Sequence, residues 1–83
     1  MMYMKVCIKF FASYRKLLPP GARNHIFEVE IEPGTTLADL MSHYDIPLTE
    51  ESVFLINGLT PLTLNQVLVD GDVVAAFSAM AGG

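Results

Sequence analysis

The chain has 83 residues, 52% of them hydrophobic and 17% charged, and a formal net charge of −4 at neutral pH. A chain of this length forms one domain that buries only about 60 to 65% of its unfolded surface, which leaves little room for an elaborate internal site. Five basic residues against nine acidic ones offer no electrostatic footprint for a phosphate backbone or an anionic membrane. Neither nucleic acid nor a membrane is therefore an expected partner.

Cys7 is the only cysteine, which excludes an internal disulfide and a cysteine-based metal cluster and agrees with a reducing, cytoplasmic location. The apolar N-terminus contains Lys5 and Lys9 and lacks a cleavage site, so it predicts a strand and not a secretory signal. No apolar run reaches the roughly 18 residues of a membrane-spanning helix.

Alternating side chains predict a first strand over residues 3–11. The two faces of this strand would carry Met4, Val6, Ile8 and Phe10 on one side and Lys5, Cys7, Lys9 and Phe11 on the other. Helix-forming residues follow from Ser13 to Leu18, and Pro19-Pro20-Gly21 ends them after one or two turns, because the residue before a proline avoids the helical region.

A second strand is expected over residues 26–31, with Glu28, Glu30 and Glu32 facing water. Thr36, followed three positions later by Asp39, is typical of a helix N-terminus, where the hydroxyl accepts a backbone N–H and the carboxylate complements the helix dipole. The helix should end by Ile46-Pro47, and one buried stripe should hold Leu37, Leu40, Met41 and Tyr44.

Residues 53–56 form a short apolar strand that Asn57-Gly58 closes with a tight turn. Residues 62–68 fit either a short strand or a 3₁₀ segment, and Asp70-Gly71-Asp72 makes another turn. The last strand, 73–77, is apolar on both faces and should lie in the middle of the sheet. This order predicts an α+β roll: a mixed sheet of four to five strands with one main helix and a short helix. Residues 1–78 would form the domain and 79–83 a flexible tail.

The residues suggest no catalytic or metal site of the chain's own. His25 and His43 have no cysteine or carboxylate around them at metal-ligand spacing, the serines lack a nucleophile-elbow motif, and no glycine-rich phosphate loop is present. Asp70 and Asp72 could be a carboxylate pair, but Asp-Gly-Asp is a common turn. We therefore expect neither a metal nor a cofactor.

Gly82 and Gly83 end the sequence with a carboxylate on a sterically minimal backbone that a partner could thread into its active site. A carboxylate is unreactive until it is activated. Adenylation by a partner would make the Gly83 carbonyl electrophilic, and a sulfur donor could then convert it to a thiocarboxylate. A folded domain with such a tail is suited to be a carrier.

Two segments carry a resemblance to a known family. Residues 56–83, INGLTPLTLNQVLVDGDVVAAFSAMAGG, resemble the closing segment of the small subunit of molybdopterin synthase (MoaD), where an Asn-containing turn, an L-x-D-G-D turn, a strand ending in Phe and a terminal Gly-Gly follow in order. Residues 6–19, VCIKFFASYRKLLP, are similar to the start of that family, in which a strand ending in Phe-Phe-Ala enters a short basic helix. The family has a β-grasp, ubiquitin-like fold, which the thiamine sulfur carrier (ThiS) and archaeal ubiquitin-like modifiers share.

The resemblance implies that a ubiquitin-activating-type enzyme adenylates Gly83, which then becomes a thiocarboxylate sulfur donor, with no catalysis by the chain alone. It implies that Gly82, with Met80 and Ala81 before it, enters the pockets of partners such as the large subunit of molybdopterin synthase. Phe11 and Phe77 correspond to aromatic residues on the outer sheet face, where they would either bind partners or cover the edges of the core. The chain departs from the family at Ser78-Ala79, where two prolines are usual, and Asn57-Gly58 is shifted by roughly one residue.

Three other functions fit the same residues. The chain could be a ubiquitin-like modifier that is conjugated to lysines through Gly83, or a sulfur carrier for thiamine or another pathway, because all of these need the same activation. It could also be a plain interaction domain with an incidental tail.

Overall fold

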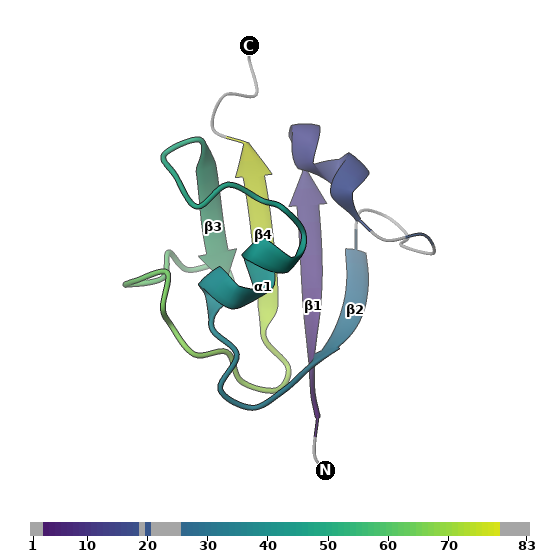
Figure 1. Cartoon of the computed structure of the whole chain (residues 1–83), viewed down its shortest axis with the longest axis vertical. Coiled ribbons are helices and arrows are strands. Elements are labelled where there is room, and N and C mark those ends of the chain that lie inside the picture. Colours follow the sequence, from purple (N-terminus) through teal and green to yellow (C-terminus); the bar gives the residue numbers. More distant parts are fainter. Residues whose placement is uncertain (1–2, 19, 21–25, 79–83) are drawn as a thin grey trace.

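Four strands form one mixed sheet in the computed structural model, which describes residues 3–18, 20 and 26–78. The strands are β1 (Met4–Phe11), β2 (Ile26–Ile31), β3 (Ser52–Ile56) and β4 (Val73–Ser78), in the spatial order β2-β1-β4-β3. The two central strands, β1 and β4, are parallel, and each pairs with its outer neighbour in the antiparallel direction. The α-helix α1 (Leu37–His43) crosses one face of the sheet, and the 3₁₀ helix η1 (Ala12–Leu17) follows the end of β1 (Figure 1). The predicted roll is confirmed.

The hydrophobic core lies between the sheet and α1. Val6, Ile8 and Phe10 alternate along β1 and are at most 1% exposed, as the sequence pattern predicts. β4 contributes Val74 and Ala76 to this core and lies between β1 and β3, in the middle of the sheet as expected. The buried core residues are Val6, Ile8, Phe10, Tyr14, Ile31, Leu37, Leu40, Met41, Ile46, Phe54, Ile56, Leu68, Val74 and Ala76.

The start of α1 is capped as the sequence predicts. The Thr36 hydroxyl accepts a hydrogen bond from the Asp39 backbone N–H, and the Asp39 carboxylate accepts one from the Thr36 N–H, each at 3.1 Å. The next free N–H groups, of Leu37 and Ala38, donate to the carbonyls of Gln66 and Leu64 at 2.9 and 2.8 Å. These bonds satisfy donors that a helix N-terminus leaves unpaired and tie α1 to the long connection before β4. No helix in the described part of the chain is long and apolar enough to cross a membrane.

Residues 62–68, for which the sequence left two possibilities, form neither a strand nor a 3₁₀ helix. Their regular structure is limited to one isolated bridge, between Val67 and Thr36. Leu68 is 1% exposed and donates its N–H to the Thr35 carbonyl, so the segment is fixed against the start of α1. Leu62 and Val67, by contrast, are 99% and 53% exposed, so the segment has no regular alternation of buried and exposed apolar residues.

A buried carboxylate links the two turns that precede and follow this connection. Asp72, only 6% exposed, accepts hydrogen bonds from the Asn57 side-chain amide (2.8 Å) and the Val69 backbone N–H (2.9 Å). The side-chain oxygen of Asn57, Oδ1, in turn accepts a hydrogen bond from the Val73 backbone N–H at 2.8 Å. Asn57 has a φ of 53°, a conformation that asparagine tolerates better than most residues. The Asp-Gly-Asp turn is therefore structural.

Removing the Asp72 carboxylate should destabilise the fold strongly. Asp72→Ala leaves two donors without their acceptor, and we expect a loss of roughly 2–4 kcal/mol in the free energy of unfolding. The control is Asp70→Ala, because Asp70 is exposed and accepts one bond, from the Lys5 N–H; it should cost about 1 kcal/mol or less. Urea unfolding measures both, and equal losses would contradict the structural role of Asp72.

Tyr44 should make the protein sensitive to alkaline pH. Desolvation by burial raises the pKa of its phenol above the usual value of 10.0. The unfolded chain thus releases this proton at lower pH than the folded protein, so stability is retained below about pH 10 and declines as the pH rises through the folded-state pKa. Urea midpoints measured from neutral pH to about pH 11 should fall more steeply for the wild type than for Tyr44→Phe. Parallel curves would show that Tyr44 contributes nothing to this decline.

Candidate functional site

The proposed reactive end of the chain follows the central strand β4. Met80, Ala81, Gly82 and Gly83 lie outside the described residues, so the site is built here from the strand that leads to them. Near the end of β4, Phe77 pairs with Phe11 in β1 on one side and with Val53 in β3 on the other. Because β1 and β4 are parallel, their C-terminal ends lie together, next to η1 (Figure 1). The last described residues before the tail are therefore held by two neighbouring strands.

A buried tyrosine attaches η1 to this end of the sheet. Tyr14 is 7% exposed, and its hydroxyl hydrogen-bonds with the hydroxyl of Ser52, the first residue of β3. Ser52 pairs in turn with Ser78, the last residue of β4. The sequence pattern predicted a short helix but not this anchor, because the partner of Tyr14 lies in a strand far along the chain.

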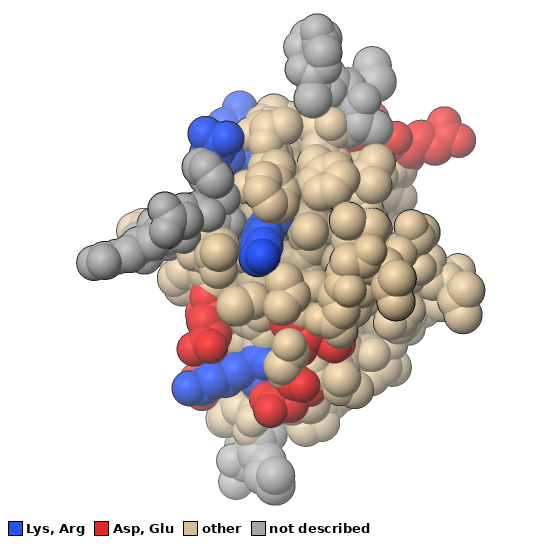
Figure 2. Space-filling model, turned by 180° about the vertical axis from the view of Figure 1, so that it is seen from behind, with Lys and Arg blue, Asp and Glu red and all other residues tan. Residues whose placement is uncertain are grey.

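The sheet face opposite α1 carries an apolar surface, which we call the outer patch. Its members share the outward face of three adjacent strands: Cys7, Phe11, Val53, Leu55, Val73, Ala75 and Phe77. Figure 2 views the molecule from this side and shows a broad uncharged area, with charged groups mainly at its margins. Exposed apolar clusters of this kind often mark protein contacts.

Phe11 and Phe77 form the aromatic part of the outer patch. Their ring centroids are 5.6 Å apart with an interplanar angle of 65°, an edge-to-face contact. Both side chains are half-buried and lie on the face away from the core. Sequence alternation assigned each to the outward face of its own strand; the parallel register brings them into contact.

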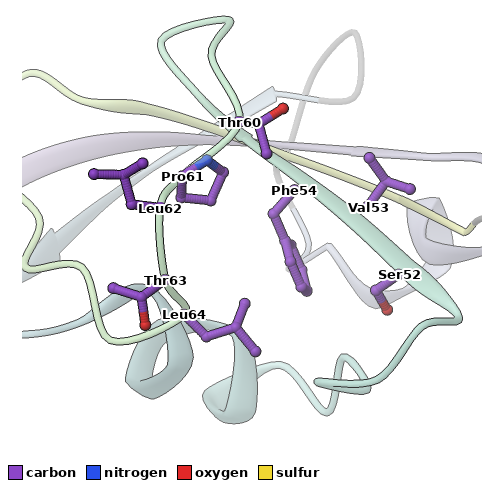
Figure 3. Close-up of a pocket in the computed structure, with 8 residues that line it drawn as sticks. All are labelled: Ser52, Val53, Phe54, Thr60, Pro61, Leu62, Thr63 and Leu64. Carbon is purple, nitrogen blue, oxygen red and sulfur yellow. The ribbon is translucent and has the colours of Figure 1, made fainter.

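The hollow drawn in Figure 3 lies between β3 and the segment after the Asn57-Gly58 turn and has a volume of about 350 Å³. Phe54 projects from β3 into it, and Leu64 lies on the opposite segment. Its lining is apolar or hydroxyl-bearing: Ser52, Val53, Phe54, Thr60, Pro61, Leu62, Thr63 and Leu64. This hollow can accommodate an apolar side chain.

A second hollow, of about 270 Å³, lies between β2 and α1 and includes Glu32, Asp39 and His43. Within the described ranges, no three histidine, cysteine or acidic side chains are grouped so that they could hold a metal ion. The His43 ring instead contacts the Tyr44 ring edge-to-face, with centroids 4.9 Å apart. The other histidine named from the sequence, His25, lies outside the described residues.

Comparisons with known proteins agree with this geometry. The sequence profile of the family described as Mut7-C ubiquitin matches residues 3–81. A Pyrococcus furiosus protein assigned as molybdopterin converting factor, subunit 1, is 26% identical and superimposes with a TM-score of 0.72 over 90% of this chain and 97% of that one. SAMP1 from Haloferax volcanii is 22% identical, with a TM-score of 0.69 over 95% and 99% of the two chains.

The ubiquitin of Caldiarchaeum subterraneum is 18% identical, with a TM-score of 0.58 over 99% of this chain and all of that one. No curated protein matches the sequence significantly. The two more distant structures support the fold, and the Pyrococcus protein also confirms the resemblance to MoaD that the terminal segments indicated. The chain belongs to the Mut7-C ubiquitin family and has the β-grasp, ubiquitin-like fold.

Proposed function

We propose that this protein is a sulfur carrier whose C-terminal Gly83 is adenylated and converted to a thiocarboxylate that donates sulfur in molybdopterin biosynthesis. One observation carries the proposal: a β-grasp domain, 26% identical to an assigned molybdopterin converting factor, subunit 1, precedes the Gly82-Gly83 sequence. Residues 1–78 are the carrier domain and 79–83 the arm that enters partner active sites. The protein acts in the cytoplasm and performs no catalysis alone.

The chemistry has two steps on the Gly83 carboxylate. A carboxylate oxygen attacks the α-phosphorus of ATP, which forms the acyl-adenylate and releases pyrophosphate. Hydrosulfide then attacks the acyl carbon, AMP leaves with the bonding electrons, and loss of the S–H proton gives the thiocarboxylate. Glycine suits both steps because no side chain crowds the carbonyl.

Two partners follow from this chemistry. A ubiquitin-activating-type enzyme supplies the nucleotide site, and a protein like the large subunit of molybdopterin synthase receives the sulfur. Five residues follow Ser78 and can span at most about 17 Å. Each partner must therefore dock close to the end of β4, and the outer patch, with Phe11 and Phe77 at that end, is the surface we assign to docking.

A second function, conjugation to lysines of other proteins through Gly83, is favoured by the structural likeness to SAMP1, because a protein of Haloferax volcanii with this fold is described as small archaeal modifier protein 1. Both functions begin with the same adenylation, and so does sulfur transfer in thiamine synthesis or another pathway. They differ in the nucleophile that attacks the acyl-adenylate or its product.

Intact mass spectrometry tests the carrier chemistry directly. After incubation with ATP, a sulfide source and a candidate adenylating enzyme, the wild type should gain the mass of one sulfur minus one oxygen. Deletion of Gly82-Gly83 should abolish the gain, and Gly83→Ala should slow it roughly 10-fold or more, because a misplaced reacting group lowers the rate steeply. The same reaction mixture with cell extract, run on a gel, would instead reveal Gly83-dependent higher-mass conjugates if the protein is a modifier. No mass change with any activator would exclude the carrier mechanism.

Phe77→Asp should weaken docking and leave the fold intact. Phe77 is half-buried on the outward face, so a carboxylate there remains in contact with water in the free protein but is buried when a partner covers the outer patch. We expect the KM for the carrier in the adenylation reaction to rise about 10-fold or more.

The matched control for this substitution is Leu62→Asp, which places the same charge on a side chain that is 99% exposed and is not a member of the outer patch. It should leave the KM unchanged, and circular dichroism should show both variants folded. An unfolded Phe77→Asp protein would place Phe77 in the core, and an unchanged KM would remove the outer patch from docking.

A further inference from the structure

Lys9 is a charged residue that lies among apolar side chains on the outward face of the sheet. It lies in β1 between Cys7 and Phe11, opposite Ile26 in β2 and Ala75 in β4, and its row continues to Leu55 in β3. Its side chain is half-buried, whereas Lys5, the other outward-facing lysine of β1, is exposed. An ammonium group thus lies within the outer patch.

Lys9 and Lys5 have different acidic neighbours. Lys5 lies directly opposite Glu30, whereas Lys9 lies opposite Ile26, and Glu28 is two residues away from Ile26, opposite Cys7. Glu28 is therefore a diagonal neighbour of Lys9, at a Cβ separation of about 7 Å for such pairs. No ion pair or hydrogen bond of the Lys9 ammonium is found within residues 3–18, 20 and 26–78. The described part of the chain therefore supplies no partner for this charge.

Docking changes that situation. A partner that covers the outer patch removes water from Lys9, and an unpaired charge at an apolar contact costs several kcal/mol. A partner offsets this cost best by placing an anionic group beside the ammonium, where the pair is also shielded from salt. Because the protein has a net charge of −4, it does not attract an acidic partner as a whole. The anionic group is therefore needed only beside Lys9.

We propose that Lys9 selects the partner that docks on the outer patch, by pairing with a carboxylate that the adenylating enzyme carries within an apolar contact surface. The inference rests on the proposed function, because it takes that enzyme as the occupant. It specifies the chemistry of the docking site: apolar side chains against Phe11, Phe77 and Val53, and one aspartate or glutamate against Lys9. Lys9 is a specificity-determining residue and takes no part in the chemistry at Gly83.

The test measures the KM for the carrier in ATP–pyrophosphate exchange, with an adenylating enzyme that thiocarboxylates the wild type. The direction in which Lys9→Met changes the KM shows whether a carboxylate faces Lys9. Methionine preserves most of the length and apolar stem of lysine but lacks its charge. With a facing carboxylate, the KM should rise about 10-fold, because that carboxylate loses its partner. Without one, the KM should fall, because the variant no longer has an ammonium to desolvate.

Charge reversal and the matched control complete the experiment. Lys9→Glu should raise the KM about 100-fold or more, and changing one acidic residue of the enzyme's docking surface to lysine should restore it. Lys5→Glu makes the same change on the same strand outside the patch and should alter the KM less than about 3-fold. Circular dichroism should show every variant folded, and Lys5→Glu should unfold at a slightly lower temperature than the wild type because it faces Glu30.

Three results would overturn the inference: a lower KM for Lys9→Met, equal effects of the reversals at Lys5 and Lys9, or rescue by no acidic-to-lysine change in the enzyme. Failure of the proposed function would give a different experimental result: the wild type would not become thiocarboxylated with any adenylating enzyme. The inference about Lys9 would then fail as well.

Discussion

The parallel pairing of β1 with β4 determines where the features of this protein lie. Strands from the two ends of the chain become neighbours at the centre of the sheet, and their C-terminal ends coincide. One register then sets three things: the contact between Phe11 and Phe77, the row that runs from Lys9 to Ala75 and Leu55, and the point at which the chain leaves the sheet toward Gly83. A shift of one residue would turn the phenylalanine of the shifted strand toward the core.

Backbone and side-chain contacts around the turns maintain this register. The Gly71 N–H donates to the Lys5 carbonyl at 2.8 Å, and the Cys7 N–H donates to the Asp72 carbonyl at 2.9 Å, so the turn before β4 is bonded to β1 before the ladder begins. The Asp72 carboxylate fixes the same turn to Asn57 at the end of β3. At the other end, Tyr14 connects η1 to Ser52. A small domain with a limited core gains rigidity from such contacts at both ends of its central strands.

Much of the fold could be predicted because its strands and helix follow local rules. The alternation in residues 3–11, the Thr36–Asp39 capping box and the two-sided apolar character of residues 73–77 each reflect the immediate chemistry of a short segment. Contacts between distant segments could not be predicted in this way. The partner of Tyr14, the bond between Asn57 and Asp72 and the contact between Phe11 and Phe77 all depend on which strands lie side by side.

Residues 62–68 remained ambiguous because they lie beside the start of α1, which imposes no alternation on them. The neighbours of Lys9 could not be predicted either. Alternation assigns Lys9 to the outward face, but only the order of the strands shows which residues surround it.

The two edges of the sheet differ in their chemistry. β2 and the residue after it present Glu28, Glu30 and Glu32, all exposed, and a second strand brought alongside them would meet a row of like charges. β3, at the opposite edge, consists of Ser52, Val53, Phe54, Leu55 and Ile56 and has no charged side chain. Exposed strand edges pair readily with other chains unless charge or proline prevents it. The two edges therefore differ in the strands that they could accept. The β2 edge repels an acidic strand, such as β2 of a second copy, whereas the β3 edge has no charged side chain and lies beside an apolar hollow.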